Sequence, residues 1–195
     1  MEIEAKFVVP NEAVLQALIE VTTLGGFRLT QGSLQPVEDS YRDTSDRLLL
    51  RAGYACRIRH KKGMALAALK GLGRPIAGVH TREEHEVMLD SGEEPEEWPA
   101  SEARDLVFRL AGGQVIEELF RVNQERHVRE AARGKEAVAE LSMDAVHIRT
   151  RHGDSDFLEV EAELLPNGNL DDLEAITRDL QRNWHLRFQS LSKFE

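Results

Sequence analysis

Apolar and charged residues alternate with a period of two over most of the chain. Because successive side chains of a strand point to opposite faces, this alternation is typical of β-strands with one polar face. Strands are therefore predicted near residues 2–8, 27–35, 37–42, 54–61, 64–70, 79–90, 117–130, 136–149 and 156–165. The short segments 131–135 and 151–154 contain glycine and polar residues, and are predicted to be hairpin turns.

Three other segments place apolar residues at helical spacing. One follows Pro10-Asn11 and ends at Gly25-Gly26, a second runs from Ser101 to Gly112-Gly113, and a third begins near Leu170. No repeat or low-complexity linker divides the 195 residues. The pattern predicts a single α+β domain spanning 1–195, with a many-stranded, mostly antiparallel sheet and a few helices outside it.

The polar faces of several strands carry unusually uniform charge. The side chains that share a face within their own strand are Glu2, Glu4 and Lys6; Arg57 and Arg59; Arg82, Glu84 and Glu86; and Glu159, Glu161 and Glu163. A solvated sheet face is the ordinary explanation of such alternation. Like charges gathered on one face repel one another, however, which favours a site that holds counter-charges. If the sheet closes into a barrel, these faces line its interior and the apolar faces pack beneath outer helices.

Composition limits the partners of such a site. Lys and Arg number 25 against 35 Asp and Glu, so the net charge of −10 disfavours binding to nucleic acid or to acidic membranes. The single cysteine, Cys56, excludes an internal disulfide, and no apolar run is long enough to span a membrane. The acidic N-terminus does not resemble a signal peptide. These features predict a soluble, cytoplasmic protein.

An ordered series of motifs resembles one known family. The series consists of Glu2/Glu4/Lys6 (E-x-E-x-K), Tyr41-Arg42-Asp43-Thr44, Arg57/Arg59, Lys70, Arg82/Glu84/Glu86, Glu159/Glu161 and Ser192-Lys193. It is similar to the signature of the CYTH superfamily, the triphosphate tunnel metalloenzymes. Arg42 departs from that signature, which often has a second aromatic residue there. The likeness spans the chain and is strongest to bacterial inorganic triphosphatases that can carry a helical CHAD domain downstream.

The resemblance implies a closed, eight-stranded antiparallel β-barrel, or tunnel, with a charged interior and flanking helices. It implies divalent-metal-dependent hydrolysis of inorganic triphosphate to pyrophosphate and phosphate, with Mg²⁺ or Mn²⁺ as cofactor. The residues implied as phosphate ligands are Lys6, Arg57, Arg59, Lys70, Arg82, Arg121 and Lys193. The implied metal ligands are Glu2, Glu4, Asp144, Glu159 and Glu161, and the implied catalytic residues are Lys6, Glu2 and Glu4.

Two other functions remain open at this point. One is an enzyme acting on an organic triphosphate, such as a thiamine triphosphatase or a class IV adenylyl cyclase. The other is a module that binds polyphosphate without hydrolysing it. The many carboxylates favour catalysis, because binding of a polyanion alone is better served by fewer acids. The seven histidines lack the spacing of a zinc site and are interpreted as packing or surface residues.

Overall fold

The computed structural model describes residues 1–90 and 92–194. The strands are β1 (Glu2–Val9), β2 (Thr23–Leu24), β3 (Phe27–Leu29), β4 (Ser33–Asp43), β5 (Tyr54–Lys61), β6 (Met64–Gly71), β7 (Val79–Arg82), β8 (Glu84–Leu89), β9 (Glu117–Arg133), β10 (Glu136–Thr150), β11 (Gly153–Leu164) and β12 (Arg187–Phe188). The helices are α1 (Glu12–Glu20), α2 (Leu48–Arg51), α3 (Glu102–Ala111) and α4 (Leu170–Arg182), with a 3-10 turn η1 (Pro95–Glu97). The predicted α+β class is confirmed, whereas the pattern did not predict α2, β2 or β12.

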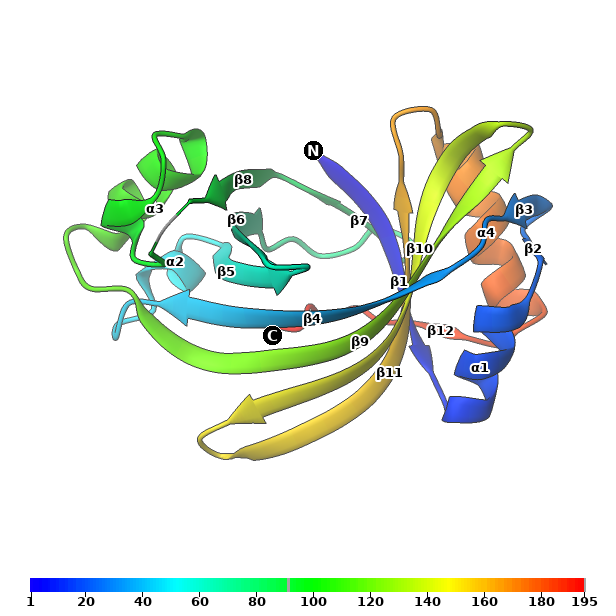
Figure 1. Cartoon of the computed structure of the whole chain (residues 1–195), viewed down its shortest axis with the longest axis horizontal. Coiled ribbons are helices and arrows are strands. Elements are labelled where there is room, and N and C mark those ends of the chain that lie inside the picture. The colour runs from blue at the N-terminus through cyan, green and yellow to red at the C-terminus, as the bar shows by residue number, and fades with distance from the viewer. Residues whose placement is uncertain (91, 195) are drawn as a thin grey trace.

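The strands form one antiparallel sheet that curls around a concave face (Figure 1). Its main path runs β12-β1-β11-β10-β9-β4-β5-β6-β8. The long strands β9, β10 and β11 follow one another through hairpins at the two predicted turns. They form the central wall of the curled sheet, and β1 and β4 lie on either side of it.

The sheet is an open, curled half-barrel of nine strands, so the predicted closed eight-stranded barrel is wrong. The cause lies in the segment that was predicted as one strand at 79–90. It is divided at Glu83: β7 pairs with β1, whereas β8 pairs with β6 at the other edge of the sheet. β12 takes the remaining part of the outer edge of β1. No strand of the described chain therefore forms a continuous ladder with both β1 and β6.

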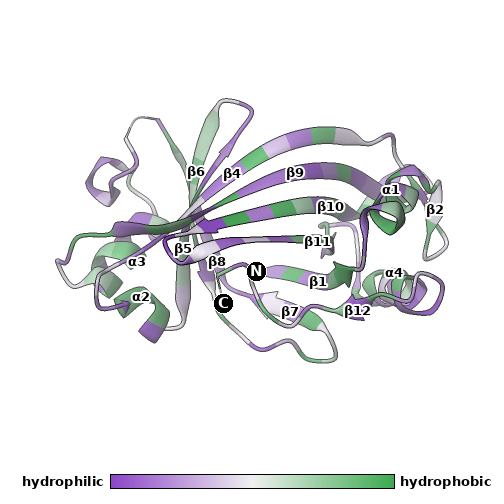
Figure 2. Cartoon of the chain, turned by 90° about the horizontal axis from the view of Figure 1, so that it is seen from below, coloured by the Kyte–Doolittle hydropathy of each residue, from purple (hydrophilic) through white to green (hydrophobic). Residues whose placement is uncertain are grey.

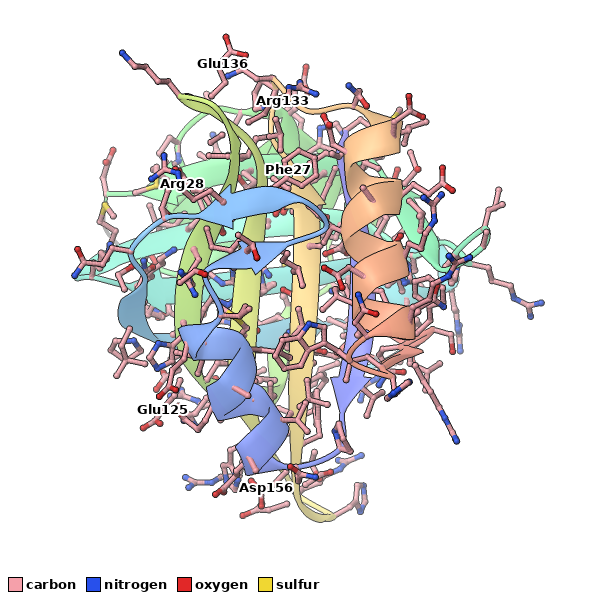
Figure 3. All side chains as sticks on the ribbon, turned by 90° about the vertical axis from the view of Figure 1, so that its right-hand side faces the viewer. Phe27, Arg28, Glu125, Arg133, Glu136 and Asp156 are labelled. Atoms are coloured by element: carbon pink, nitrogen blue, oxygen red, sulfur yellow. The ribbon has the colours of Figure 1, made fainter. Side chains whose placement is uncertain are left out.

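Two apolar clusters pack on the convex side of the sheet, beneath the helices. Leu18 of α1 and Ile176 of α4 pack with Phe7 and Val160 at one end, where Figure 3 shows both helices across the sheet. Residues of α2 and α3 pack on β5 and β6 at the other end. Full burial of each such aliphatic or aromatic side chain contributes about 1.5–3 kcal/mol. None of the helices in the described residues is long and apolar enough to cross a bilayer.

The core on the convex side leaves the concave face free to carry charge. Polar and apolar residues alternate along the strands, as the colour bands of Figure 2 show. On β1 the residues Ala5 and Phe7 are fully buried in the convex cluster, while Glu4 and Lys6 point to the other side. The outer helices thus let the inner face hold a site in place of a hydrophobic core.

Candidate active site

A cavity of about 350 Å³ lies in the concave face, and we refer to it as the ionic pocket. Its basic lining residues are Lys6, Arg57, Arg59, Lys61, Lys70, Arg82, Arg126 and Lys193. Its acidic lining residues are Glu2, Glu4, Glu84, Glu86, Glu140, Glu161 and Glu163. The structure therefore brings together most of the residues that the sequence singled out, from strands far apart along the chain.

Strand register explains how opposite charges meet in this pocket. Lys6 of β1 lies directly opposite Glu161 of β11, and its Nζ donates to Glu161 Oε1 at 2.7 Å. The same ammonium lies 3.3 Å from Glu4 Oε1. Burial alone would lower the pKa of Lys6, but Glu161 and Glu4 raise it above its usual value. Lys6 is therefore a permanent cation at neutral pH.

Three buried carboxylates form a second group, of which Glu161 lines the pocket. Asp144, Glu159 and Glu161 each offer an oxygen within 4.8 Å of the others. Arg126 Nη2 binds Asp144 Oδ2 at 2.6 Å and Glu161 Oε2 at 2.7 Å. Lys193 Nζ lies 3.0 Å from Glu161 and contacts Glu159. The carboxylates are thus held close together by cations of the chain itself.

Burial and neighbouring charges shift the pKa values of Glu159 and Glu161 in opposite directions. Burial raises the pKa of Glu159 to about 7, with Lys193 opposing the shift and Glu161 adding to it. Burial also acts on Glu161, but Lys193, Lys6 and Arg126 lower its pKa well below the usual range. Oxygen donors of this kind suit hard cations such as Mg²⁺ and Mn²⁺. The Asp144, Glu159 and Glu161 carboxylates therefore fit the implied metal.

The other two predicted metal ligands bind bases of the chain. Glu2 Oε1 accepts a hydrogen bond from Lys70 Nζ at 2.8 Å. Glu4 Oε1 lies 3.8 Å from Arg82 Nη1, in addition to its contact with Lys6. The structure thus places Glu2 and Glu4 in the ionic pocket but outside the group of three carboxylates.

Several buried polar atoms of the pocket make no hydrogen bond among the described residues. They are Arg57 Nε, Arg82 Nε and Glu2 Oε2. Buried polar groups are ordinarily bonded, and leaving one unbonded costs about 1–3 kcal/mol. Donors and acceptors in this state are suited to a polar ligand that completes their bonding.

Arg121 is the predicted phosphate ligand that the structure does not bring to the pocket. Its side chain is 49% exposed and pairs with Glu38 and Glu118 on the convex side of β9. Arg126, five positions along the same strand, lines the pocket instead. An odd spacing of five puts the two side chains on opposite faces of the strand. That parity is the signal in the sequence that only one of the two arginines can line the pocket.

A second, larger cavity of about 1520 Å³ adjoins the ionic pocket. Val8 follows Lys6 on the same face of β1 and lines this cavity together with Val37 and Phe157. Its lining also contains acids, among them Glu125 and Asp156, which Figure 3 labels at the end of the sheet near α1. The concave face therefore changes from an ionic to a mainly apolar lining along its length.

Glu163 gives a prediction for the metal-free protein. Burial raises the pKa of Glu163 to about 7, and Glu2, Glu4 and Glu140 act in the same direction against Lys70. Because the folded state then binds the proton more tightly, this residue stabilises the fold at acid pH, and the stabilisation is lost as pH rises through 7. Glu163→Gln is expected to raise the free energy of unfolding by about 1–2 kcal/mol at pH 8.

Urea unfolding in EDTA at pH 4 and pH 8 measures this difference. At pH 4 the variant and the unchanged protein should be equally stable, since Glu163 is protonated in both states. Glu136→Gln is the matched control, because Glu136 is exposed at the β9–β10 hairpin (Figure 3). Equal stability of Glu163→Gln and the unchanged protein at pH 8 would contradict the raised pKa.

The family model of the CYTH domain matches residues 1–195. The chain belongs to the CYTH domain family. A search of curated protein sequences finds no match to this CYTH chain. Solved structures match it over most of their length.

One similar structure is a Hippeastrum protein described as an adenylyl cyclase with a dominant triphosphatase activity. It has a TM-score of 0.72 and 21% identity, and the match covers 100% of the CYTH chain and 93% of that protein. A Pyrococcus horikoshii protein has a TM-score of 0.63 and 20% identity, with 100% and 97% covered. The triphosphatase of the Mimivirus capping enzyme has a TM-score of 0.51 and 12% identity, with 92% and 90% covered. At these identities the likeness establishes the fold.

Proposed function

We propose that this CYTH domain hydrolyses inorganic triphosphate to pyrophosphate and phosphate with Mg²⁺ or Mn²⁺. The observation that carries the proposal is the ionic pocket itself, which is lined by buried arginines with unbonded Nε atoms and by Glu161, a member of the group of three carboxylates. A triphosphate chain is a small, dense polyanion, and guanidinium groups match its oxygens in pairs. A pocket of about 350 Å³ suits such a substrate better than it suits a large organic molecule.

The residues of the chain divide into binding and proton-handling roles. Lys6, Arg57, Arg82 and Arg126 would hold the phosphate oxygens and stabilise charge that develops on the leaving pyrophosphate. Lys70 and Lys193 would join them, and all the bases now bound to carboxylates, Lys6 and Arg126 included, would exchange these contacts for phosphate. The positions of these bases on rigid strands favour one orientation of the substrate.

The attacking water needs a group that accepts its proton. Glu2 keeps Oε2 without a hydrogen bond while Lys70 holds Oε1. Glu2, with Glu4 beside it on the same face of β1, is therefore proposed to take the proton as the water oxygen bonds to the terminal phosphorus. The bond from that phosphorus to the bridging oxygen breaks, and the oxygen leaves with pyrophosphate. A divalent cation held by Asp144, Glu159 and Glu161 would supply further neutralisation of phosphate charge.

An organic triphosphate is the second candidate substrate. The larger cavity favours it, since Val8, Val37 and Phe157 could contact an apolar group attached to the phosphate chain. The acids of its lining would then favour a substrate with a cationic organic part.

We also propose a cytoplasmic location, because the only cysteine, Cys56, is buried and forms no disulfide.

Phosphate release from tripolyphosphate, thiamine triphosphate and ATP tests the proposal, each with Mg²⁺, Mn²⁺ or EDTA. We expect tripolyphosphate to be the fastest substrate with either metal. We expect no release above background in EDTA, because without a divalent cation the carboxylates repel the phosphate. Faster release from an organic triphosphate would favour the second candidate. Binding of tripolyphosphate without release would indicate a binding module, and full activity in EDTA would contradict the metal dependence.

A further inference from the structure

The two arginines of β5 that share a face are held in different ways. Arg57 Nη2 forms an ion pair with Glu84 Oε1 at 3.7 Å, and Arg57 Nε makes no hydrogen bond. Arg59 donates from Nε to Asp39 Oδ1 and from Nη2 to Asp39 Oδ2, both at 2.8 Å. This is the parallel, two-bond geometry in which a carboxylate fixes a guanidinium plane. Arg57 is thus available to a ligand, whereas Arg59 is already fixed.

Asp39 is well placed to fix that guanidinium. It lies on β4 directly opposite Arg59 in the register, and its side chain is fully buried. Gln124 of β9 donates a third hydrogen bond, from Nε2 to Asp39 Oδ2 at 2.9 Å. Burial would raise the pKa of Asp39, but Arg57 and Arg59 lower it well below the usual range. Asp39 is therefore ionised, and it is bonded through both oxygens.

Asp39 does not itself line the ionic pocket, although Arg59 does. A residue in this position has no direct contact with a ligand in the pocket and acts on it through its neighbour. The bonds to Asp39 use two of the three guanidinium nitrogens of Arg59. Arg59 Nη1 is left to donate to a phosphate oxygen. The pairing of β4 with β5 determines where this nitrogen lies.

We propose that Asp39 is a positioning residue that fixes the Arg59 guanidinium for phosphoryl transfer in the ionic pocket. This inference rests on the proposed triphosphatase function. A guanidinium held by a buried carboxylate loses little freedom when substrate binds, and it meets the developing charge of the transition state in one orientation. A guanidinium without this partner still attracts phosphate, but not in that orientation. The role of Asp39 is therefore in turnover more than in substrate affinity.

The test is steady-state hydrolysis of tripolyphosphate by Asp39→Asn, Arg59→Lys and the double variant. Asparagine keeps the shape of Asp39 but offers a single acceptor oxygen, and lysine keeps the charge of Arg59 but lacks the planar fork. Each single variant is expected to lower kcat by about tenfold or more and to change KM by less than about threefold. The double variant should be about as slow as the slower single variant, because both changes break the same pair.

Glu136→Gln is the control, since it removes one negative charge outside both cavities. Glu136 is exposed at the β9–β10 hairpin, so kcat should stay unchanged. Thermal unfolding of every variant shows whether it is folded. If Asp39→Asn does not fold, Arg59→Lys alone decides, because it keeps Asp39 and the charge of position 59.

Each outcome of these assays counts for or against the inference. A fall in kcat with a nearly constant KM, and no further fall in the double variant, supports it. A kcat within about twofold of the unchanged protein, or fold-losses that multiply in the double variant, overturns it while the proposed function stands. An unchanged protein that releases no phosphate from tripolyphosphate overturns both the proposed function and this inference.

Discussion

Arg57→Met is expected to lower kcat/KM for tripolyphosphate by about 100- to 1000-fold, the usual cost of removing one donor that stabilises transition-state charge. Arg57 is buried, its Nε makes no hydrogen bond, and its Nη2 forms an ion pair with Glu84 Oε1 at 3.7 Å. Among the arginines of the pocket, Arg57 therefore has the most hydrogen-bond donors left for a ligand. The measurement is the initial rate of phosphate release over a range of substrate concentrations.

The same change should lower stability less than it lowers activity. Arg57 pairs with Glu84 and its charge lowers the pKa of the buried Asp39, so its removal is expected to lower the free energy of unfolding by about 1–3 kcal/mol. Arg121→Met serves as the control, since that side chain is half exposed on the convex side. Loss of activity in Arg121→Met, or normal activity in folded Arg57→Met, would contradict the assignment of the ionic pocket as the substrate site.

The periodic pattern was sufficient to predict which face each charged residue occupies within most strands. Glu2, Glu4 and Lys6 line the pocket together because a strand repeats every two residues, whatever its neighbours are. Helix starts were equally local: Ser101 accepts a hydrogen bond from the backbone N–H of Arg104, as expected of an N-cap. Such features depend on a few adjacent residues, and so they can be read from one sequence.

Contacts between strands could not be derived in the same way. Asp39 meets Arg59 because β4 and β5 pair in one particular register, and the alternation of either strand is compatible with other registers. The division of β7 from β8 at Glu83 is another case, since residues 80–86 are all polar or charged and their pattern marks no break at this residue. The predicted closed barrel failed for this reason, and Asp39 was missed for the same one.

Arg121 shows a third limit of the pattern. The inward face of β9 carries Val122 and Gln124 as well as Arg126, so neither charge nor hydropathy distinguishes it from the outward face. The side of this strand is set by its neighbours, where Arg126 lies opposite Asp144. Only the spacing of five between the two arginines excluded one of them.

Arg126→Met is expected to lower the free energy of unfolding by about 3–5 kcal/mol, the cost of removing one partner from a buried ion pair. Arg126 is 6% exposed and its guanidinium binds both Asp144 and Glu161. Asp144 is fully buried, so without Arg126 its charge would lose the contact at 2.6 Å and keep the more distant Lys193 Nζ, 3.7 Å from Oδ2. Urea unfolding at pH 8 in EDTA measures the loss without interference from bound metal.

A second substitution separates this charge effect from lost packing. Arg126→Met/Asp144→Asn removes the uncompensated charge, and it should be more stable than Arg126→Met alone although it carries one more change. Arg121→Met, on the same strand, should lose less than about 1 kcal/mol because its ion pairs are exposed to water. If Arg126→Met were no less stable than Arg121→Met, the buried pair with Asp144 would not be needed to hold the carboxylates together, and Lys6 and Lys193 would be sufficient to compensate their charge.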